Sequence, residues 1–247
     1  MSLALYLVTA GSLDATRAGD LVVLDGPEGR HAVTVRRTQR GERLRLADGA
    51  GRVVTGEVES VDRAELSLRV DAVETAPEPS PRFVLVQALA KGDRDDQAIE
   101  AATELGVDEV VPWQAGRSIV QWRGERGDKA WRKWDAVLVA ATKQSRRSRR
   151  PLLAPVVTTA GLAARIAAGG TAYVLHEDAD VRLAAQDLPD DGEVLLVVGP
   201  EGGISPEELE AFTAAGAHTV RLGDTVLRSS SAGPAALAVL SAATRWR

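Results

Sequence analysis

Two glycine-bearing loops contain the residues best suited to hold a ligand. The first, Gly199–Gly203, reads Gly-Pro-Glu-Gly-Gly and follows the apolar run that begins at Glu193. It precedes Ser205–Glu208, where Ser at the N-cap, Pro at the first helical position and Glu at the third predict a helix start. Glycine lets the backbone approach a ligand closely, and a helix start offers free N–H groups. An ordinary tight turn explains the same composition equally well, and neither the dinucleotide fingerprint nor a P-loop is present.

The second loop, Leu222–Gly233, also follows a predicted strand and precedes a predicted helix. It carries Arg228, the only charged side chain from Thr225 to Gly233, followed by three serines. A cation in such a loop is suited to stabilise negative charge on a bound substrate. A serine-rich N-cap region for the last helix accounts for the same run.

Two basic stretches are candidates for binding nucleic acid. Lys143–Arg150 holds five positive charges in eight residues and is closed by Pro151, and Arg30–Arg45 holds six arginines against Glu42 alone. Clustered cations suit phosphates. The alternatives are a solvated loop for the first stretch and, for the second, arginines that simply alternate outward along strands.

The elements that position these residues change in kind along the chain. Up to Val73, short runs such as LVVL, HAVTV, ERLRLADG and GRVVTGEV alternate with turns, with a hairpin signal at Asp48-Gly49, and predict a small β-barrel. Ala76–Pro81 contains three prolines and predicts a linker. After Arg82, apolar strands alternate with helices, which predicts a mainly parallel sheet covered on both faces.

Strand and helix boundaries can be assigned in this second region. The predicted strands include Phe83–Leu89, Ala172–Glu177 and Glu193–Gly199. The predicted helices span Asp93–Leu105 and Gly233–Trp246, and a third begins at Ser205 and ends at Gly216. The run HTVRLG, His218–Gly223, is the predicted strand before the second loop, so both glycine loops follow strands of the same sheet.

Composition limits the chemistry. The 247 residues carry a formal net charge of -5, so a nucleic-acid site requires locally concentrated cations. The absence of cysteine excludes disulfides, Cys-ligated zinc, iron–sulfur clusters and thiol catalysis. His31, His176 and His218 are dispersed and show no metal-ligand spacing. Neither a signal peptide nor a membrane span is expected, and a cytoplasmic location is the expectation.

Several motifs together carry a resemblance to a known family. They are GPEGGISPEE, RLGDTVLRSSSAG, ALAKGDRDDQAIEAATELGVDEVVPW, AATKQSRRSRRP and, near the N-terminus, HAVTVRR followed by LADG. Over nearly its whole length the chain resembles the SPOUT superfamily, and within it the RsmE family, which methylates N3 of a uridine in 16S rRNA. The combination of GPEGG with a downstream LG…VLR is highly specific, and KGD…ATELG narrows the match to this family.

The resemblance implies a fold, a cofactor and partners. The expected fold is α/β: a SPOUT-type C-terminal domain with a trefoil knot and a mainly parallel sheet, plus a small PUA-like β-barrel. The expected boundaries are 1–75 for the barrel, 76–81 for the linker and 82–247 for the methyltransferase domain. The implied cofactor is S-adenosyl-L-methionine, without a metal, and the implied partners are 16S rRNA in the small ribosomal subunit and a second copy of the chain that borders the active site.

The resemblance and the residue chemistry together assign a site. Uracil N3 must lose its proton, which calls for a base or an anchor for the anion; Glu201 is the candidate base and Arg228 the candidate anchor. The expected cofactor-binding residues are Leu175, His176, Gly199, Pro200, Glu201, Gly202, Gly203, Ile204, Leu222, Gly223, Val226, Leu227, Arg228 and Ser230. The expected RNA-binding residues are Arg30, His31, Arg36, Arg37, Lys91, Lys143, Arg146, Arg147 and Arg149.

The chain departs from the family pattern at three places. Ser230 stands where many members have Glu, Lys143-Gln144 where many have Glu-Gln, and Ala101 where a Lys is common. These changes bear on individual side chains and leave a backbone-built pocket intact. Two alternatives stay open: a knotted RNA methylase acting on tRNA or on another rRNA base, and a non-catalytic RNA-binding assembly factor.

Overall fold

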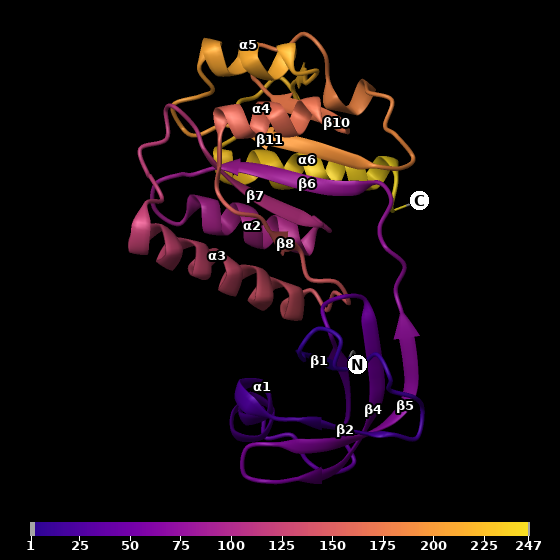
Figure 1. Cartoon of the computed structure of the whole chain (residues 1–247). Coiled ribbons are helices and arrows are strands. Elements are labelled where there is room, and N and C mark those ends of the chain that lie inside the picture. Colours follow the sequence, from indigo (N-terminus) through magenta and orange to yellow (C-terminus); the bar gives the residue numbers. More distant parts are fainter. Residues whose placement is uncertain (1–2, 247) are drawn as a thin grey trace. The chain divides into compact units, whose positions relative to one another are not determined.

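The computed structural model describes residues 3–246 and divides into two compact units (Figure 1). The first unit comprises Met1–Glu78 together with Thr142–Arg150, and the second comprises Pro79–Ala141 together with Pro151–Arg247. The first division falls inside the proline-rich segment expected as a linker. The basic segment Thr142–Arg150 groups with the N-terminal unit, whereas the boundaries expected from the sequence placed it in 82–247.

The N-terminal unit is a five-stranded sheet in the order β1-β3-β4-β5-β2, in which β1 is parallel to β3 and the other pairs are antiparallel. Its core packs side chains such as Tyr6, Leu13, Leu44 and Leu68. The hairpin predicted at Asp48-Gly49 is confirmed, because Gly49 has φ +72° and the strands on either side pair. The elements are β1 (Ala4–Leu7), β2 (Leu21–Leu24), α1 (Gly26–Arg30), the π-helical turn η1 (His31–Val35), β3 (Arg43–Ala47), β4 (Arg52–Val61) and β5 (Leu66–Thr75).

One predicted strand of this unit is wrong. HAVTV, His31–Val35, forms a π-helical turn that continues directly from α1. Pro27 at the start of α1 favours helix there, and Ala32 is buried in the barrel core while Val35 stays exposed. Burial of one small residue on a helical turn therefore outweighs the strand propensity of the β-branched residues.

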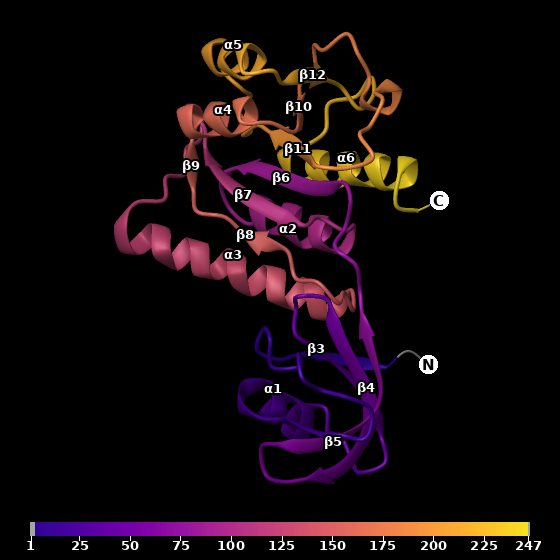
Figure 2. The same cartoon turned by 45° about the vertical axis from the view of Figure 1, so that its right-hand side comes forward.

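The C-terminal unit is a parallel sheet in the order β12-β10-β11-β6-β7-β8, with β9 paired to β7, as Figure 2 shows from a second side. The predicted parallel sheet is thus confirmed. Its elements are β6 (Arg82–Ala88), α2 (Arg94–Glu104), β7 (Glu109–Gln114), α3 (Gly124–Gln144), β8 (Leu152–Leu153), β9 (Val157–Thr158), α4 (Thr159–Ala167), β10 (Thr171–Leu175), the short η2 (Leu183–Ala185), β11 (Glu193–Val198), α5 (Pro206–Ala214), β12 (His218–Val220) and α6 (Ser229–Ala243).

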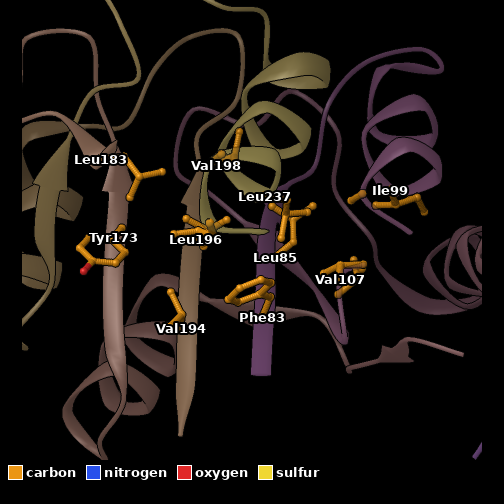
Figure 3. Packing of buried hydrophobic residues seen from close by; sticks show 14 of the residues in the cluster. Phe83, Leu85, Ile99, Val107, Tyr173, Leu183, Val194, Leu196, Val198 and Leu237 are labelled. Carbon is orange, nitrogen blue, oxygen red and sulfur yellow. The ribbon is translucent and has the colours of Figure 1, made fainter. Parts of the chain in front are cut away.

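Helices cover both faces of this sheet, as predicted. On one face Phe83 and Leu85 of β6 pack with α2 and α6, where Ile99 and Leu237 lie (Figure 3). On the other face the alternate β6 residues pack with α4 and α5, against Leu162, Ile166 and Phe212. The period of two along β6 explains why its sequence is apolar throughout. None of the described helices is long and apolar enough to cross a membrane.

The last helix begins earlier than predicted. It starts at Ser229, with Arg228 at the N-cap, so the three serines form its first turn. Gly233 was the predicted first residue of this helix, but it lies inside the helix and serves close packing: a Cβ there would lie 2.8 Å from Leu85 Cδ1. The missing side chain lets α6 lie close to β6 within the core.

Candidate active site

Two adjoining cavities lie at the carboxyl ends of the parallel strands β10, β11 and β12. The larger has a volume of about 440 Å³ and the smaller about 170 Å³. They share six lining residues, which makes them parts of one hollow. The combined size lies in the range typical of small-molecule sites. The shared residues are Leu175, His176, Glu177, Val226, Leu227 and Ala232.

The two glycine loops meet at this hollow. Twelve of the fourteen residues expected to bind the cofactor line it: Leu175, His176, Gly199, Pro200, Glu201, Gly203, Ile204, Leu222, Gly223, Val226, Leu227 and Arg228. Gly202 and Ser230 do not line either cavity. A Cβ on Gly202 would instead face Arg117 Cβ at 3.4 Å, and Ser229 takes the lining position beside Ser230.

Other lining residues were not anticipated from the sequence. Arg94, Glu177 and Ser229 all line the larger cavity. For Arg94 a signal existed, because it follows the buried strand β6, which is the neighbour of β11 in the sheet. Residues just after neighbouring parallel strands share one edge of the sheet, where ligands bind.

The walls fit the cofactor that the family resemblance implies. Leu175, Val198, Ile204 and Leu227 give an apolar surface suited to an adenosine group. Ser229 Oγ is buried and has no hydrogen-bond partner within the described residues, so it is available to a ligand. Backbone groups of both loops and the carboxylate of Glu177 supply polar partners. S-adenosylmethionine combines such an adenosine with a polar, charged tail.

The glycine loop 199–203 allows little freedom. A Cβ on Gly199 would lie 2.7 Å from Ile204 Cγ1, and Gly203 has φ +72°, a region that favours glycine. Arg117 Nη1 donates to Gly202 O at 3.0 Å from the segment after β7. The loop is therefore held in shape by the chain before a ligand arrives.

Glu208 fixes the helix that follows this loop. The predicted capping box is present: Ser205 Oγ accepts from the Glu208 N–H and Glu208 accepts from the Ser205 N–H at 3.1 Å. The same carboxylate, which is only 6% exposed, also accepts from Gly116 N–H at 2.7 Å and from Thr159 Oγ1 at 2.8 Å. One buried carboxyl group thus joins α5 to two other segments at the edge of the sheet.

Glu201 forms an ion pair at the larger cavity. Arg94 Nη1 donates to its Oε1 at 2.8 Å, and the Lys91 N–H lies 3.4 Å from the same oxygen. Burial acts to raise the pKa of Glu201, but hydrogen bonds from its own N–H, from Arg94 and from Lys91 outweigh it and hold the pKa below its ordinary value. A carboxylate so stabilised is charged at neutral pH and is a weakened base.

His176 lines both cavities with a defined tautomer. Its Nδ1 accepts a hydrogen bond from the Asp178 N–H at 3.2 Å. In the neutral ring the proton then resides on Nε2, which makes that atom a donor. His176 is consequently suited to donate a hydrogen bond to a ligand rather than to accept a proton at Nε2.

Asp95 is the second residue of α2, directly after Arg94, and is only 6% exposed. Burial and the neighbouring Asp96 carboxylate raise the pKa of Asp95 from 3.8 to about 6. Because the folded-state pKa is the higher one, the stability that Asp95 contributes is full below about pH 4 and is lost as pH rises through about 6.

Replacing Asp95 with Asn is therefore expected to change stability in a pH-dependent way. The quantity of interest is the free energy of unfolding of Asp95→Asn minus that of wild type. This difference should be more favourable to the variant at about pH 7.5 than at about pH 4.5, by roughly 2 kcal/mol. A hydrogen bond lost in the variant lowers the free energy of unfolding equally at both pH values, so it cancels when the two are compared. Urea unfolding at the two pH values measures it, with exposed Asp93→Asn as the control; equal differences at both values would contradict the raised pKa.

The expected RNA-binding residues divide into free and engaged side chains. In the N-terminal unit Arg30, His31, Arg36 and Arg37 are exposed on and after α1, and in the C-terminal unit Lys91 is exposed. The three arginines and Lys91 leave their charges open to solvent, as phosphate binding requires, whereas the ring of His31 packs edge-on against Tyr6.

The basic segment Lys143–Arg150 is partly used within the N-terminal unit. Lys143 pairs with Glu28 at 2.7 Å, and Arg149 donates to Ala76 O at 2.9 Å and to Pro77 O at 3.1 Å. Arg147 also has partners. Arg146 is exposed and, among residues 3–246, makes no side-chain hydrogen bond or ion pair. The geometry therefore favours Arg146 as the phosphate contact of this segment.

Arg146→Ala is expected to weaken RNA binding and to make its salt dependence shallower by about one unit of slope. Arg149→Ala is the matched comparison, because it removes the same charge from an engaged side chain. It should leave the slope unchanged and instead lower the stability of the N-terminal unit by about 1–3 kcal/mol. RNA-binding titrations at several salt concentrations measure the slope of affinity against salt. An equal loss of slope in both variants would refute the assignment of Arg146, rather than Arg149, as the phosphate contact.

Comparisons with known proteins agree with this geometry. The family model described as an RNA methyltransferase domain matches residues 77–241, and that of the RNA methyltransferase PUA domain matches 24–71. A curated relative from Mycobacterium bovis, named ribosomal RNA small subunit methyltransferase E, is 46% identical over 92% of this chain and 89% of its own length. The PUA-type barrel expected at the N-terminus is thereby confirmed.

Two solved structures share the fold over nearly the whole chain. A putative methyltransferase from Legionella pneumophila in complex with the bound cofactor SAM is 28% identical, with a TM-score of 0.85 over 99% of both chains. A ribosomal RNA small subunit methyltransferase E from Neisseria gonorrhoeae, bound to S-adenosyl methionine, is 24% identical, with a TM-score of 0.86 over 98% of both chains. The matched domains, the mycobacterial relative and the shared fold show that this chain belongs to the family of RNA methyltransferases that includes the ribosomal RNA small subunit methyltransferases E.

Proposed function

We propose that the protein transfers the methyl group of S-adenosylmethionine to N3 of one uridine in the 16S rRNA of the small ribosomal subunit. It acts as a homodimer in the cytoplasm, where ribosomal subunits are assembled. The observation that carries the proposal is the hollow between the two glycine loops, in a chain 46% identical to a ribosomal RNA small subunit methyltransferase E.

The reaction needs positioning and charge stabilisation more than covalent help. When bound, S-adenosylmethionine supplies an electrophilic methyl carbon: the N3 electron pair forms the new C–N bond, the electrons of the broken C–S bond stay on sulfur, and the N3 proton passes to solvent or a base. The chain must therefore hold the uracil in line and favour its anion.

Individual residues supply these functions. The loop 199–203 and the apolar wall hold the cofactor, and Ser229 Oγ and His176 Nε2 offer it hydrogen bonds. Arg228, exposed at the N-cap of α6, supplies a cation to the anionic uracil. Glu201 was expected as the base, but, against the effect of burial, hydrogen bonds from its own N–H and from the paired Arg94 hold its pKa below the ordinary value and make it a weaker base.

Recognition of the RNA is assigned to the N-terminal unit. Its exposed cations Arg30, Arg36, Arg37 and Arg146 neutralise phosphates, while Arg43, Arg45 and Arg69 are paired with Asp71, Glu74 and Glu59. Local concentration of free arginines explains how a chain with a net charge of -5 binds RNA.

The decisive experiment treats small subunits from a strain lacking this enzyme with the protein and labelled S-adenosylmethionine, followed by mass mapping of the modified nucleotides. The expected product is one 3-methyluridine in 16S rRNA. Methylation of tRNA or of another base would overturn the proposed substrate. Absence of cofactor binding in a calorimetric titration would identify an RNA-binding assembly factor instead.

A further inference from the structure

A second arginine lies at the cavity that holds Arg228. Arg94 is the first residue of α2, follows β6, and lines the larger cavity with half of its side chain exposed. Glu201, which lines the same cavity, is its ion-pair partner at 2.8 Å. The cavity thus holds two arginines, of which one is anchored by a carboxylate.

The anchored guanidinium keeps most of its donors. Only Nη1 is used, by Glu201 Oε1; within the described residues Nε and Nη2 have no hydrogen-bond partner. A guanidinium presents five N–H groups in a rigid plane, so a fork remains for an acceptor in the cavity. Glu201 is itself fixed by the Lys91 N–H, which limits where Arg94 can point.

The proposed reaction creates an acceptor suited to this fork. When uracil N3 loses its proton, the negative charge is shared with the ring oxygens O2 and O4. Resting on the proposed function, we infer that Arg94 binds one of these oxygens and stabilises the uracil anion, and that Glu201 is a positioning residue that aims Arg94. Arg94 is then a catalytic residue alongside Arg228, and water removes the proton.

This assignment changes how the replacement of Glu201 is expected to affect the rate of methylation. A general base contributes about 10²–10⁴-fold to the rate, and its loss removes that contribution. A positioning carboxylate acts only through the guanidinium that it holds. Its loss is therefore expected to change the pH profile in the same direction as the loss of Arg94, and to have no further effect once Arg94 is absent.

The test measures single-turnover methylation of small subunits at saturating RNA and cofactor, from about pH 6 to about pH 10. Arg94→Gln is expected to move the midpoint of the pH profile up by about one unit or more, so the rate near pH 7 falls about tenfold. Affinities for cofactor and RNA stay unchanged. Arg94→Lys, which keeps the charge, restores most of the rate. Lys133→Gln removes a cation that pairs with Asp96 and Asp93 and does not line the cavity, and it leaves the profile as in wild type.

The other outcomes are equally decisive. An unchanged midpoint with weaker RNA binding and a shallower salt slope would show that Arg94 contacts a phosphate, which overturns the inference. Glu201→Ala is expected to shift the midpoint upward as Arg94→Gln does and to add no further shift in the double variant. A loss of about 10²–10⁴-fold that persists in the Arg94→Gln background would overturn the positioning role. Mass mapping of the product separates a failure of the Arg94 role from a failure of the proposed function. If uracil N3 is methylated but Arg94→Gln keeps the wild-type pH profile, only the role of Arg94 is overturned. If another atom is methylated, the proposed function and the role of Arg94 are both overturned.

Discussion

Replacing Arg228 with Ala is expected to lower single-turnover methylation by about 10²-fold or more, the cost of losing one electrostatic donor at a developing charge. Arg228 is exposed at the N-cap of α6, lines the larger cavity and makes no ion pair within the described part of the chain. Its cation is therefore available to the uracil. Cofactor affinity should stay within about twofold, because the apolar wall and the backbone of the loops remain.

The same variant separates catalysis from assembly. If Arg228 instead pairs with a carboxylate of a second copy, Arg228→Ala should weaken cofactor binding or release monomers, which sedimentation detects. Arg126→Ala is the control, since Arg126 is an exposed arginine on α3 that lines neither cavity. Turnover near the wild-type rate would contradict both roles.

Glu208→Ala is expected to destabilise the C-terminal unit by about 3 kcal/mol or more. The change removes the buried carboxylate that is the shared acceptor of Gly116 N–H, Thr159 Oγ1 and Ser205 N–H. For a chain of this size the loss corresponds to a melting temperature lower by about 6–12 °C. Cofactor affinity should fall as well, because the helix start after the glycine loop is no longer fixed.

Tryptophan fluorescence measures this effect selectively. All five tryptophans, Trp113, Trp122, Trp131, Trp134 and Trp246, belong to the C-terminal unit. Glu210→Ala changes an exposed carboxylate on the same helix and should leave the transition in place. A Glu208→Ala transition that coincides with wild type would show that its hydrogen bonds are replaced by water at no cost.

The sheet and its helices could be predicted because their signals are local. Apolar runs such as Phe83–Leu89 require burial on both faces, and Ser205–Glu208 contains every residue of a capping box. Two predictions were wrong for the same reason: the strand at His31–Val35, and the start of α6 at Gly233 instead of Ser229. In both places packing against distant residues, which a local pattern does not report, decides the conformation.

Sequence reasoning located the two loops of the candidate site and twelve of its fourteen expected lining residues, but not the exact set. Strand ends brought Gly199–Gly203 and Leu222–Arg228 to one hollow, but which side chains face it depends on backbone dihedral angles. Gly202 and Ser230 do not line the hollow for that reason. Charge counts also hide pairing: Lys143 and Arg149 find their partners, Glu28 and Ala76, more than seventy residues away in the chain.

The grouping of Thr142–Arg150 with the N-terminal unit has a consequence for dissecting the protein. The chain passes between the units three times, after Glu78, after Ala141 and after Arg150, so no single cut separates them. A protease that nicks the proline-rich segment would yield two fragments that still co-purify, because the larger fragment carries a piece of the barrel unit, fastened to it by the Lys143–Glu28 pair and by Arg149. A fragment that starts at Arg82 would likewise present this piece without the strands it packs on, and would be prone to aggregate through it.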